Sequence, residues 1–128
     1  MSKLVLIRGI PGSGKTTKAR TLEEVGFKHF EADQFFEQGG AYSFDAAKLG
    51  QAHQWCQWMT AKALQDGFDV VVSNTFCRRW EMEPYFQMAK KASAELVVIE
   101  ATGRFENVHG VSKEKVMQML DRWEEVVV

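Results

Sequence analysis

Cysteine is scarce in this chain, which excludes two common means of stabilising a small domain. Only Cys56 and Cys77 are present among the 128 residues, and they stand far apart in the sequence. A disulfide framework or a structural zinc site needs several ligand residues at short, regular spacings. We therefore expect two buried thiols rather than a disulfide or a zinc centre.

Long apolar segments and an excess of one charge are also missing. No run approaches the roughly 20 apolar residues that span a bilayer, and the first residues show no signal-peptide pattern. The 16 basic and 17 acidic side chains leave a formal net charge of −1, so no global field attracts the chain to nucleic acid or to an anionic membrane. We expect a soluble, cytoplasmic protein without membrane contact.

The charge is nevertheless distributed unevenly. The first 20 residues contain no acidic side chain and five basic ones: Lys3, Arg8, Lys15, Lys18 and Arg20. This local excess favours an anionic ligand near the N-terminus.

One motif explains what that ligand is. Residues Gly9-Ile10-Pro11-Gly12-Ser13-Gly14-Lys15-Thr16 match the Walker A pattern G-x-x-x-x-G-K-[ST] at every fixed position. An apolar run of strand type precedes the motif and a helical pattern follows it. At such a turn, backbone N–H groups and the positive end of the helix dipole converge on phosphate oxygens. The motif predicts binding of a nucleoside triphosphate.

Each residue type in the motif has an expected role. Lys15 supplies a catalytic point charge to the β- and γ-phosphates, and the Thr16 hydroxyl ligates Mg²⁺. Gly12 and Gly14 are expected to take positive φ angles, and Pro11 to stiffen the loop. ATP and Mg²⁺ are the expected cofactors. The expected nucleotide-binding residues are Gly9, Pro11, Gly12, Ser13, Gly14, Lys15, Thr16, Thr17 and Arg122.

The chain lacks internal repeats, low-complexity segments and linkers rich in glycine, proline or serine, which predicts a single domain over residues 1–128. Strand patterns alternate with helical ones: strands at 4–7, 27–31, 69–72 and 95–100, and helices at 15–25, after Ser43, at 82–92 and after Ser112. This order predicts an α/β fold, a three-layer α/β/α P-loop NTPase with a mainly parallel sheet of four to five strands. The fifth strand depends on whether Val126–Val128 begins one or ends a fraying helix.

Local signals indicate the ends and inner faces of the helices. Gly26 and Gly67 end two of them, Ser43 and Ser112 are expected N-caps, and Pro84 suits a first helical turn. Apolar residues at spacings of three and four predict the inner faces: Leu49, Ala52, Cys56, Met59 and Ala63 in one helix, and Val116, Leu120 and Trp123 in the last.

Asp33 directly follows the second strand, at the edge of the sheet where ligands gather in such folds. A carboxylate there can accept the proton of an attacking hydroxyl, and it can also hold a water of the Mg²⁺ shell. Its position favours these roles no more than it favours a helix cap or a solvated side chain. Asp33 is thus a candidate catalytic base, substrate contact and metal ligand.

The third strand ends without an acidic residue. Ser73, Asn74 and Thr75 follow the apolar run, where P-loop proteins commonly carry an aspartate for Mg²⁺. The metal is then expected on Thr16, the phosphates and water, with Asp33 as a further ligand. Asn74 and Thr75 are expected to hydrogen-bond the acceptor, and turn or capping chemistry is their alternative role.

Arginine commonly stabilises the charge that develops on the γ-phosphate. Arg104 lies after the fourth strand, where small P-loop kinases carry a lid, and is the expected catalytic arginine. Arg79, with Arg78 beside it, is expected to reach an acceptor phosphate, and Arg122 to contact the nucleotide. Each arginine is alternatively a solvated surface residue.

Two further residues complete the expected acceptor site. His53 adjoins the apolar stripe of the second helix, where a hydrogen-bonded boundary histidine is the alternative. Phe36 belongs to a group of aromatic residues that would stack a base or, with greater weight, form core: Phe35, Phe36, Tyr42 and Phe44.

With these motifs in place, the chain resembles the P-loop kinases that include polynucleotide 5′-kinases and zeta-toxin-like kinases, and among them the AAA_33-type proteins and short relatives of NEDD4-binding protein 2. The matching stretches span almost the whole chain: residues 9–17, 31–36, 52–56, 73–75, 80–85, 107–111 and 122–124. The resemblance implies transfer of the ATP γ-phosphate to a hydroxyl, with Asp33 at the position of the general base. Polynucleotide kinases carry an arginine where this chain has Phe36, and their lid is matched loosely, with Arg104 as its single arginine.

The expected function is therefore an ATP- and Mg²⁺-dependent kinase acting on a hydroxyl of a polynucleotide end, a nucleotide or a modified base. Two alternatives stay open. A kinase of the same fold would phosphorylate a small molecule, because the apolar Phe36 suits a compact acceptor. An ATP-dependent binding module would recruit a protein partner without phosphotransfer, because Ser73 stands where an acidic residue is usual.

Overall fold

A single parallel sheet organises the molecule. In the computed structural model, which describes residues 2–37, 43–103 and 111–126, the sheet contains β1 (Lys3–Arg8), β2 (Lys28–Phe30), β3 (Val70–Asn74) and β4 (Glu95–Glu100) in the order β2-β3-β1-β4. All three neighbouring pairs are parallel. The central strands β1 and β3 are almost entirely buried, because helices cover both faces of the sheet.

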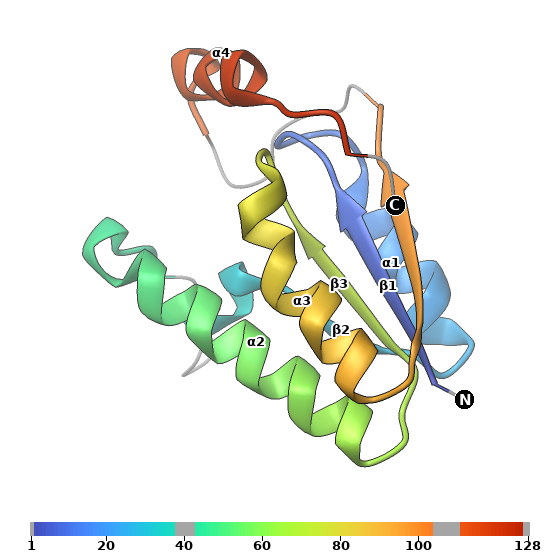
Figure 1. Ribbon diagram of the computed structural model, residues 1–128. Coiled ribbons are helices and arrows are strands. Elements are labelled where there is room, and N and C mark those ends of the chain that lie inside the picture. Colours follow the sequence, from blue (N-terminus) through green and yellow to red (C-terminus); the bar gives the residue numbers. More distant parts are fainter. Residues whose placement is uncertain (1, 38–42, 104–110, 127–128) are drawn as a thin grey trace.

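The helices connect successive strands and form the outer layers. They are α1 (Lys15–Glu24), α2 (Leu49–Gln65), α3 (Arg79–Lys91) and α4 (Lys113–Arg122), with two 3₁₀ segments, η1 (Ala32–Glu37) and η2 (Ala46–Lys48). Figure 1 shows α1 on one face of the sheet, α2 and α3 on the other, and α4 beyond the carboxyl ends of the strands. The predicted three-layer α/β/α fold with a parallel sheet is confirmed.

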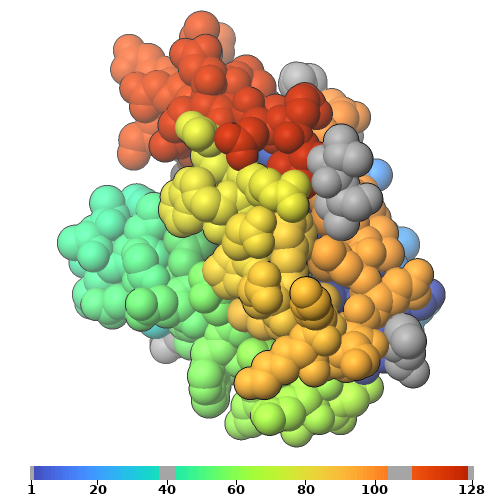
Figure 2. All heavy atoms as spheres, in the orientation of Figure 1, coloured from blue at the N-terminus to red at the C-terminus, as the bar shows by residue number. Residues whose placement is uncertain are grey.

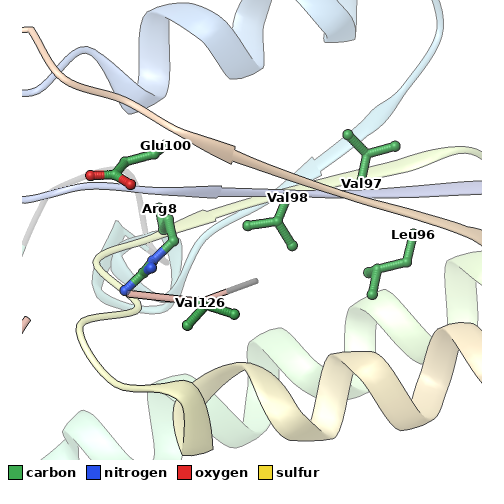
Figure 3. Close-up of a pocket in the computed structure, with 6 residues that line it drawn as sticks. All are labelled: Arg8, Leu96, Val97, Val98, Glu100 and Val126. Carbon is green, nitrogen blue, oxygen red and sulfur yellow. The ribbon is translucent and has the colours of Figure 1, made fainter. Parts of the chain in front are cut away.

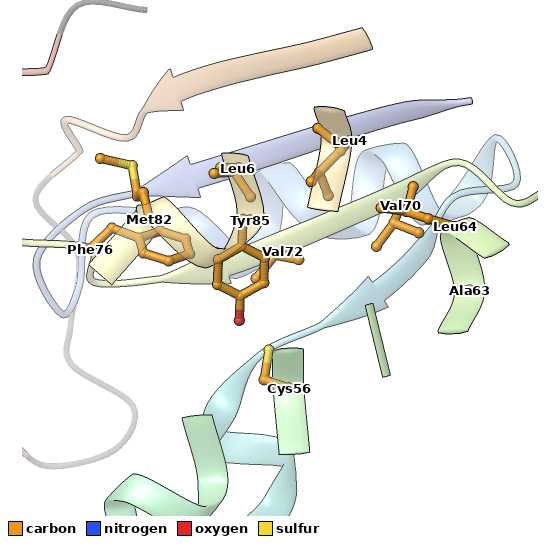
Figure 4. Packing of buried hydrophobic residues seen from close by; sticks show 11 residues of the cluster. Leu4, Leu6, Cys56, Ala63, Leu64, Val70, Val72, Phe76, Met82 and Tyr85 are labelled. Carbon is orange, nitrogen blue, oxygen red and sulfur yellow. The ribbon is translucent and has the colours of Figure 1, made fainter. Parts of the chain in front are cut away.

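Alternate residues of the central strands supply two separate cores. Leu4, Leu6, Val70 and Val72 pack with residues of α2 and α3, among them Cys56 and Tyr85 (Figure 4). Val5, Ile7 and Val71 point to the opposite face and pack around Ala19 of α1. Both cysteines are buried and free, as expected. The period-two alternation of a strand thus assigns neighbouring residues to opposite layers.

Several local predictions hold. The last helix is capped by Ser112, whose Oγ accepts a hydrogen bond from the Lys115 N–H at 3.3 Å. Gly26 and Gly67 follow the ends of α1 and α2 with φ angles of 104° and 87°. The fourth strand covers residues 95–100, the predicted range.

The start of the second helix differs from the prediction. Ser43 is not its N-cap. Asp45 caps η2, which leads into α2, and its Oδ1 accepts a hydrogen bond from the Ala47 N–H at 3.0 Å, whereas the N-cap of α2 itself is Lys48. Ala52, Cys56 and Ala63 of the predicted stripe are buried. Leu49 is 41% exposed and Met59 only half-buried, whereas Thr60 and Leu64 are buried. A polar residue can occupy this face because the Thr60 hydroxyl donates a hydrogen bond to the Cys56 carbonyl at 2.8 Å.

The later helices also differ in detail. α3 begins at Arg79, so Pro84 lies in its second turn, where it removes one intrahelical hydrogen bond. In α4, Val116 is half-buried and Leu120 is 47% exposed, because this helix packs over the end of the sheet rather than on a face. No fifth strand forms within the described residues, which end at Val126.

The C-terminal segment lies against the start of α3 and reaches one face of the sheet, where Val126 packs on the cluster that contains Leu6. Figure 2 shows α4 and the residues after it across one end of the molecule, next to the beginning of α3. The Glu124 N–H donates a hydrogen bond to the Cys77 carbonyl at 2.8 Å. No helix in the described parts of the chain combines the length and apolar character needed to cross a bilayer.

Candidate active site

The glycine-rich loop joins the carboxyl end of β1 to the start of α1, as the motif predicts. Gly12 and Gly14 have φ angles of 81° and 92°, which confirms the expected left-handed backbone. At Gly9 a Cβ atom would lie 2.9 Å from the Ala101 carbonyl oxygen and would collide with the Ser13 hydroxyl. The backbone therefore curls more tightly at Gly9 than any other residue allows.

The loop contains polar groups that suit an anionic ligand. The Ser13 hydroxyl is buried and has no hydrogen-bond partner among the described residues. Lys15 Nζ donates a hydrogen bond to the Ile10 carbonyl at 3.2 Å, so the ammonium lies over the loop. Burial lowers the pKa of Lys15, and the carboxylates of Glu31 and Asp33 act against this shift. Phosphate oxygens would satisfy both groups, because they accept hydrogen bonds and carry negative charge.

A carboxylate that sequence reasoning did not single out stands beside the loop. Glu31 Oε2 accepts a hydrogen bond from the Ser73 hydroxyl at 2.7 Å and a longer one from the Thr16 hydroxyl at 3.4 Å. His29 Nε2 lies 2.9 Å from Ser73 Oγ and 3.6 Å from Glu31 Oε2. No group of three or more His, Cys, Asp or Glu side chains suited to a metal occurs in the part of the chain that the structure describes. Thr16 with one carboxylate fits Mg²⁺, which needs few protein ligands when phosphates supply the others.

Asp33 is half-buried in η1, and a backbone hydrogen bond of the preceding residue, Ala32, fixes its position. The Ala32 N–H donates a hydrogen bond to Asn74 Oδ1 at 2.9 Å, which ties the start of η1 to the end of β3. Asn74 Nδ2 contacts Cys56 Sγ at 3.8 Å. The negative charge of Asp33 acts on both Lys15 and His53. The structure thus brings the candidate base to the same end of the sheet as the glycine-rich loop, and assigns Asn74 a positioning contact.

The other expected acceptor contacts have mixed surroundings. His53 is half-buried on α2, and burial lowers its pKa while Glu81 and Asp33 act against this shift. Phe36 is 5% exposed and packs with Ala32 and Ala52, so only a small part of its ring is accessible to an acceptor. Its contact with an acceptor stays a prediction. The Thr75 carbonyl accepts a hydrogen bond from the Gly9 N–H at 3.2 Å, which joins β3 to the loop.

The structure describes two of the predicted site arginines, Arg79 and Arg122. Arg79 Nε pairs with Glu83 at 3.1 Å, and its guanidinium lies 5.4 Å from the Phe86 ring. Arg122 is the exposed last residue of α4. Thr17 of α1, another residue expected to bind the nucleotide, is also exposed. Arg104 lies outside the described residues, so its catalytic role stays a prediction.

A different arginine, Arg8, joins several chain segments at this end of the molecule through hydrogen bonds. Arg8, at the end of β1, is 2% exposed and donates hydrogen bonds to the carbonyls of Phe76 and Cys77 and, at 2.6 Å, of Glu124. Burial lowers its pKa, and nearby carboxylates, Glu100 first, oppose the shift. A basic residue within an apolar strand was the signal that could have identified it. Arg8 also lines a groove of about 350 Å³ with Leu96, Val97, Val98, Glu100 and Val126 (Figure 3).

The strand, glycine-rich loop and helix on a parallel sheet define a P-loop nucleotide-binding fold. Residues 4–105 match the family AAA_33, described as an AAA domain, and the chain belongs to this family. NEDD4-binding protein 2 of Homo sapiens is 35% identical over 136 residues, an alignment that covers 97% of this chain and 8% of that protein.

Solved structures of kinases share the fold. One is the Pnkp1/Rnl/Hen1 complex, with a TM-score of 0.65 and 17% identity over 91% of this chain and 38% of that chain. Another is the APS kinase of Mycobacterium tuberculosis in complex with AMPPNP and APS, with a TM-score of 0.59 and 14% identity over 91% of this chain and 67% of that chain. The chain therefore has the P-loop kinase fold, and it spans only a small part of the human relative.

Proposed function

We propose that this chain is an ATP- and Mg²⁺-dependent kinase that transfers the γ-phosphate to a hydroxyl group. One observation carries the proposal: Asn74 holds the start of η1 at the end of β3, so that the charge of Asp33 acts on Lys15 of the glycine-rich loop. A phosphate site and a candidate base at one sheet edge are the two parts that transfer to an alcohol requires.

The residues divide the reaction between them. The loop amides and Lys15 bind the β- and γ-phosphates, and Lys15 balances the charge that develops there. Thr16 would hold Mg²⁺, which when bound neutralises phosphate charge and orients the γ-phosphate. Asp33 accepts the proton of the attacking hydroxyl. The transition state is stabilised mainly by positioning and charge, which a rigid sheet edge supplies.

The proposed acceptor is a polynucleotide end, a nucleotide or a modified base. The likeness of the fold to that of an APS kinase in complex with AMPPNP and APS supports this choice, because that kinase binds nucleotide ligands. A small-molecule acceptor is the second candidate. It is favoured by the aromatic cluster that begins two residues after Asp33, in which the Phe36 ring lies 5.5 Å from Phe35 and 5.1 Å from Phe44.

The acceptor is identified by incubating the protein and Mg²⁺ with ATP labelled in the γ-phosphate and a panel of hydroxyl compounds. The panel contains DNA and RNA with 5′-hydroxyl ends, nucleosides, nucleotides and simple sugars. Label in a nucleic acid or nucleotide supports the first candidate, and label in a sugar alone supports the second. ATP that binds but labels no acceptor and forms no ADP would overturn the kinase proposal in favour of a binding module.

A further inference from the structure

The carboxylate of Glu31 is placed by strand register. Phe30 of β2 pairs with Val72 of β3, so the next residues, Glu31 and Ser73, lie at the same level, Glu31 just beyond β2 and Ser73 still within β3. Side chains alternate along a strand, and Val71 faces α1. Ser73 and Glu31 share that face, which is the side of the sheet where α1 lies with Thr16 in its first turn.

Ser73, Thr16 and His29 lie against this carboxylate. Glu31 Oε2 accepts a hydrogen bond from the Ser73 hydroxyl at 2.7 Å and one from the Thr16 hydroxyl at 3.4 Å. Because Ser73 donates its only proton to Glu31, His29 Nε2, 2.9 Å from Ser73 Oγ, is left to act as donor in that contact. The side chains of His29 and Glu31 are 6% and 16% exposed, so little water competes for these hydrogen bonds.

The arrangement addresses a specific need of a hydroxyl metal ligand. A threonine hydroxyl binds Mg²⁺ through an oxygen lone pair and keeps its proton, which must then point away from the metal. A carboxylate is a strong acceptor for that proton, and a partner of this kind orients the ligand and raises its basicity. Ser73 stands at the strand end where P-loop proteins commonly carry an acidic residue. Here its hydroxyl instead donates a hydrogen bond to Glu31, which follows the neighbouring strand β2.

We infer that Glu31 is the positioning residue for magnesium at Thr16, and that Ser73 and His29 hold Glu31 in place. The inference rests on the proposed function, since it concerns the metal that accompanies the nucleotide. It assigns Glu31 a task separate from that of Asp33: Glu31 orients the metal ligand, and Asp33 accepts the proton of the acceptor.

The test separates metal binding from nucleotide binding. ATP affinity is measured by calorimetry in a Mg²⁺ series and in EDTA, for wild type, Glu31→Gln and Ser73→Ala. Glu31→Gln should require about 10- to 100-fold more Mg²⁺ for tight ATP binding. Its ATP affinity in EDTA should not fall, because the change removes a negative charge beside Lys15. Ser73→Ala should show a smaller shift in the same direction. Glu23→Gln, an exposed change on α1, is the matched control and should behave as wild type.

The outcomes distinguish the two proposals. If wild type binds no ATP at any Mg²⁺ concentration, the proposed function fails and the role of Glu31 fails with it. If wild type binds MgATP and a folded Glu31→Gln keeps the same Mg²⁺ dependence, the kinase proposal stands and this inference is overturned. Equal losses with and without metal would show a structural role only, which also overturns it. Should Glu31→Gln not fold, an unchanged Mg²⁺ dependence of Ser73→Ala has the same meaning.

Discussion

The buried guanidinium of Arg8 stacks on the indole ring of Trp123, with its Cζ 4.0 Å from the ring centroid. Arg8 is the residue directly before the glycine-rich loop, and Trp123 follows the last helix. The same guanidinium donates a 2.6 Å hydrogen bond to the Glu124 carbonyl. The C-terminal segment is therefore fastened to the strand that carries the phosphate-binding loop.

Arg8→Met should destabilise the fold by about 2–4 kcal/mol, because it leaves buried carbonyls without a donor. The free energy of unfolding in urea checks this value. Arg20→Met, an exposed change on α1, should alter it by less than about 0.5 kcal/mol. Equal stability of the two variants would show that the Arg8 contacts contribute nothing.

Gly9→Ala should weaken ATP binding by about tenfold or more, since moving the loop to relieve the clash with Ala101 costs at least one charged hydrogen bond. Calorimetry with MgATP measures the loss. Gly50→Ala is the matched control: no atom lies within 4 Å of its added Cβ, and it lies in α2. It should leave affinity unchanged and raise stability by about 0.5–1 kcal/mol. Full ATP affinity in Gly9→Ala would contradict the tight loop geometry.

Asp33→Asn should lower the rate of phosphate transfer by about 10²- to 10⁴-fold and leave ATP affinity unchanged, because a general base acts only on the acceptor proton. The rate is measured with the acceptor that the labelling panel identifies. Asp66→Asn, at the exposed end of α2, should retain the wild-type rate. An unchanged rate in Asp33→Asn would remove Asp33 from the role of base.

Lys15→Met should stabilise the nucleotide-free fold near neutral pH while abolishing ATP binding. Burial lowers the Lys15 pKa from 10.5, so the unfolded chain holds this proton more tightly than the folded one. The stability of wild type relative to Lys15→Met should therefore rise as pH increases through the lowered pKa toward about 10.5. Urea unfolding of both proteins at about pH 7 and about pH 10 tests this sign. A stability difference that does not vary with pH would contradict the buried charge.

Local chemistry was sufficient to predict the elements that have their own signals. Gly12 and Gly14 adopt positive φ because the Walker A turn requires it, and the apolar run at 95–100 forms β4 where expected. The stripe on the second helix was predicted only in part. Leu49 is exposed and Thr60 is buried. Burial along this helix depends on which turns pack against the rest of the fold, and the hydrophobicity of a residue does not determine that.

The residues around the predicted loop could not be found in this way. Glu31 and Ser73 are far apart in the chain and meet only through the register of β2 and β3. Arg8 donates hydrogen bonds to carbonyls that follow β3 and α4. In the sequence it was recognised only as one of the five basic residues near the N-terminus. Contacts of this kind depend on which strands become neighbours, and no local pattern records that choice.

From the chain's residues alone came the phosphate-binding turn, the alternation of strands and helices, and the candidate base after the second strand, because each depends on the backbone preferences and polarity of adjacent residues. Tertiary structure decided toward which face of the sheet each polar side chain at the end of β3 points. Ser73 turns toward Glu31 and the phosphate-binding loop, and Asn74, one residue later, turns toward Cys56 and the start of η1. The physical reason is the two-residue period of a strand, which sends adjacent side chains to opposite layers once helices cover both sides of the sheet.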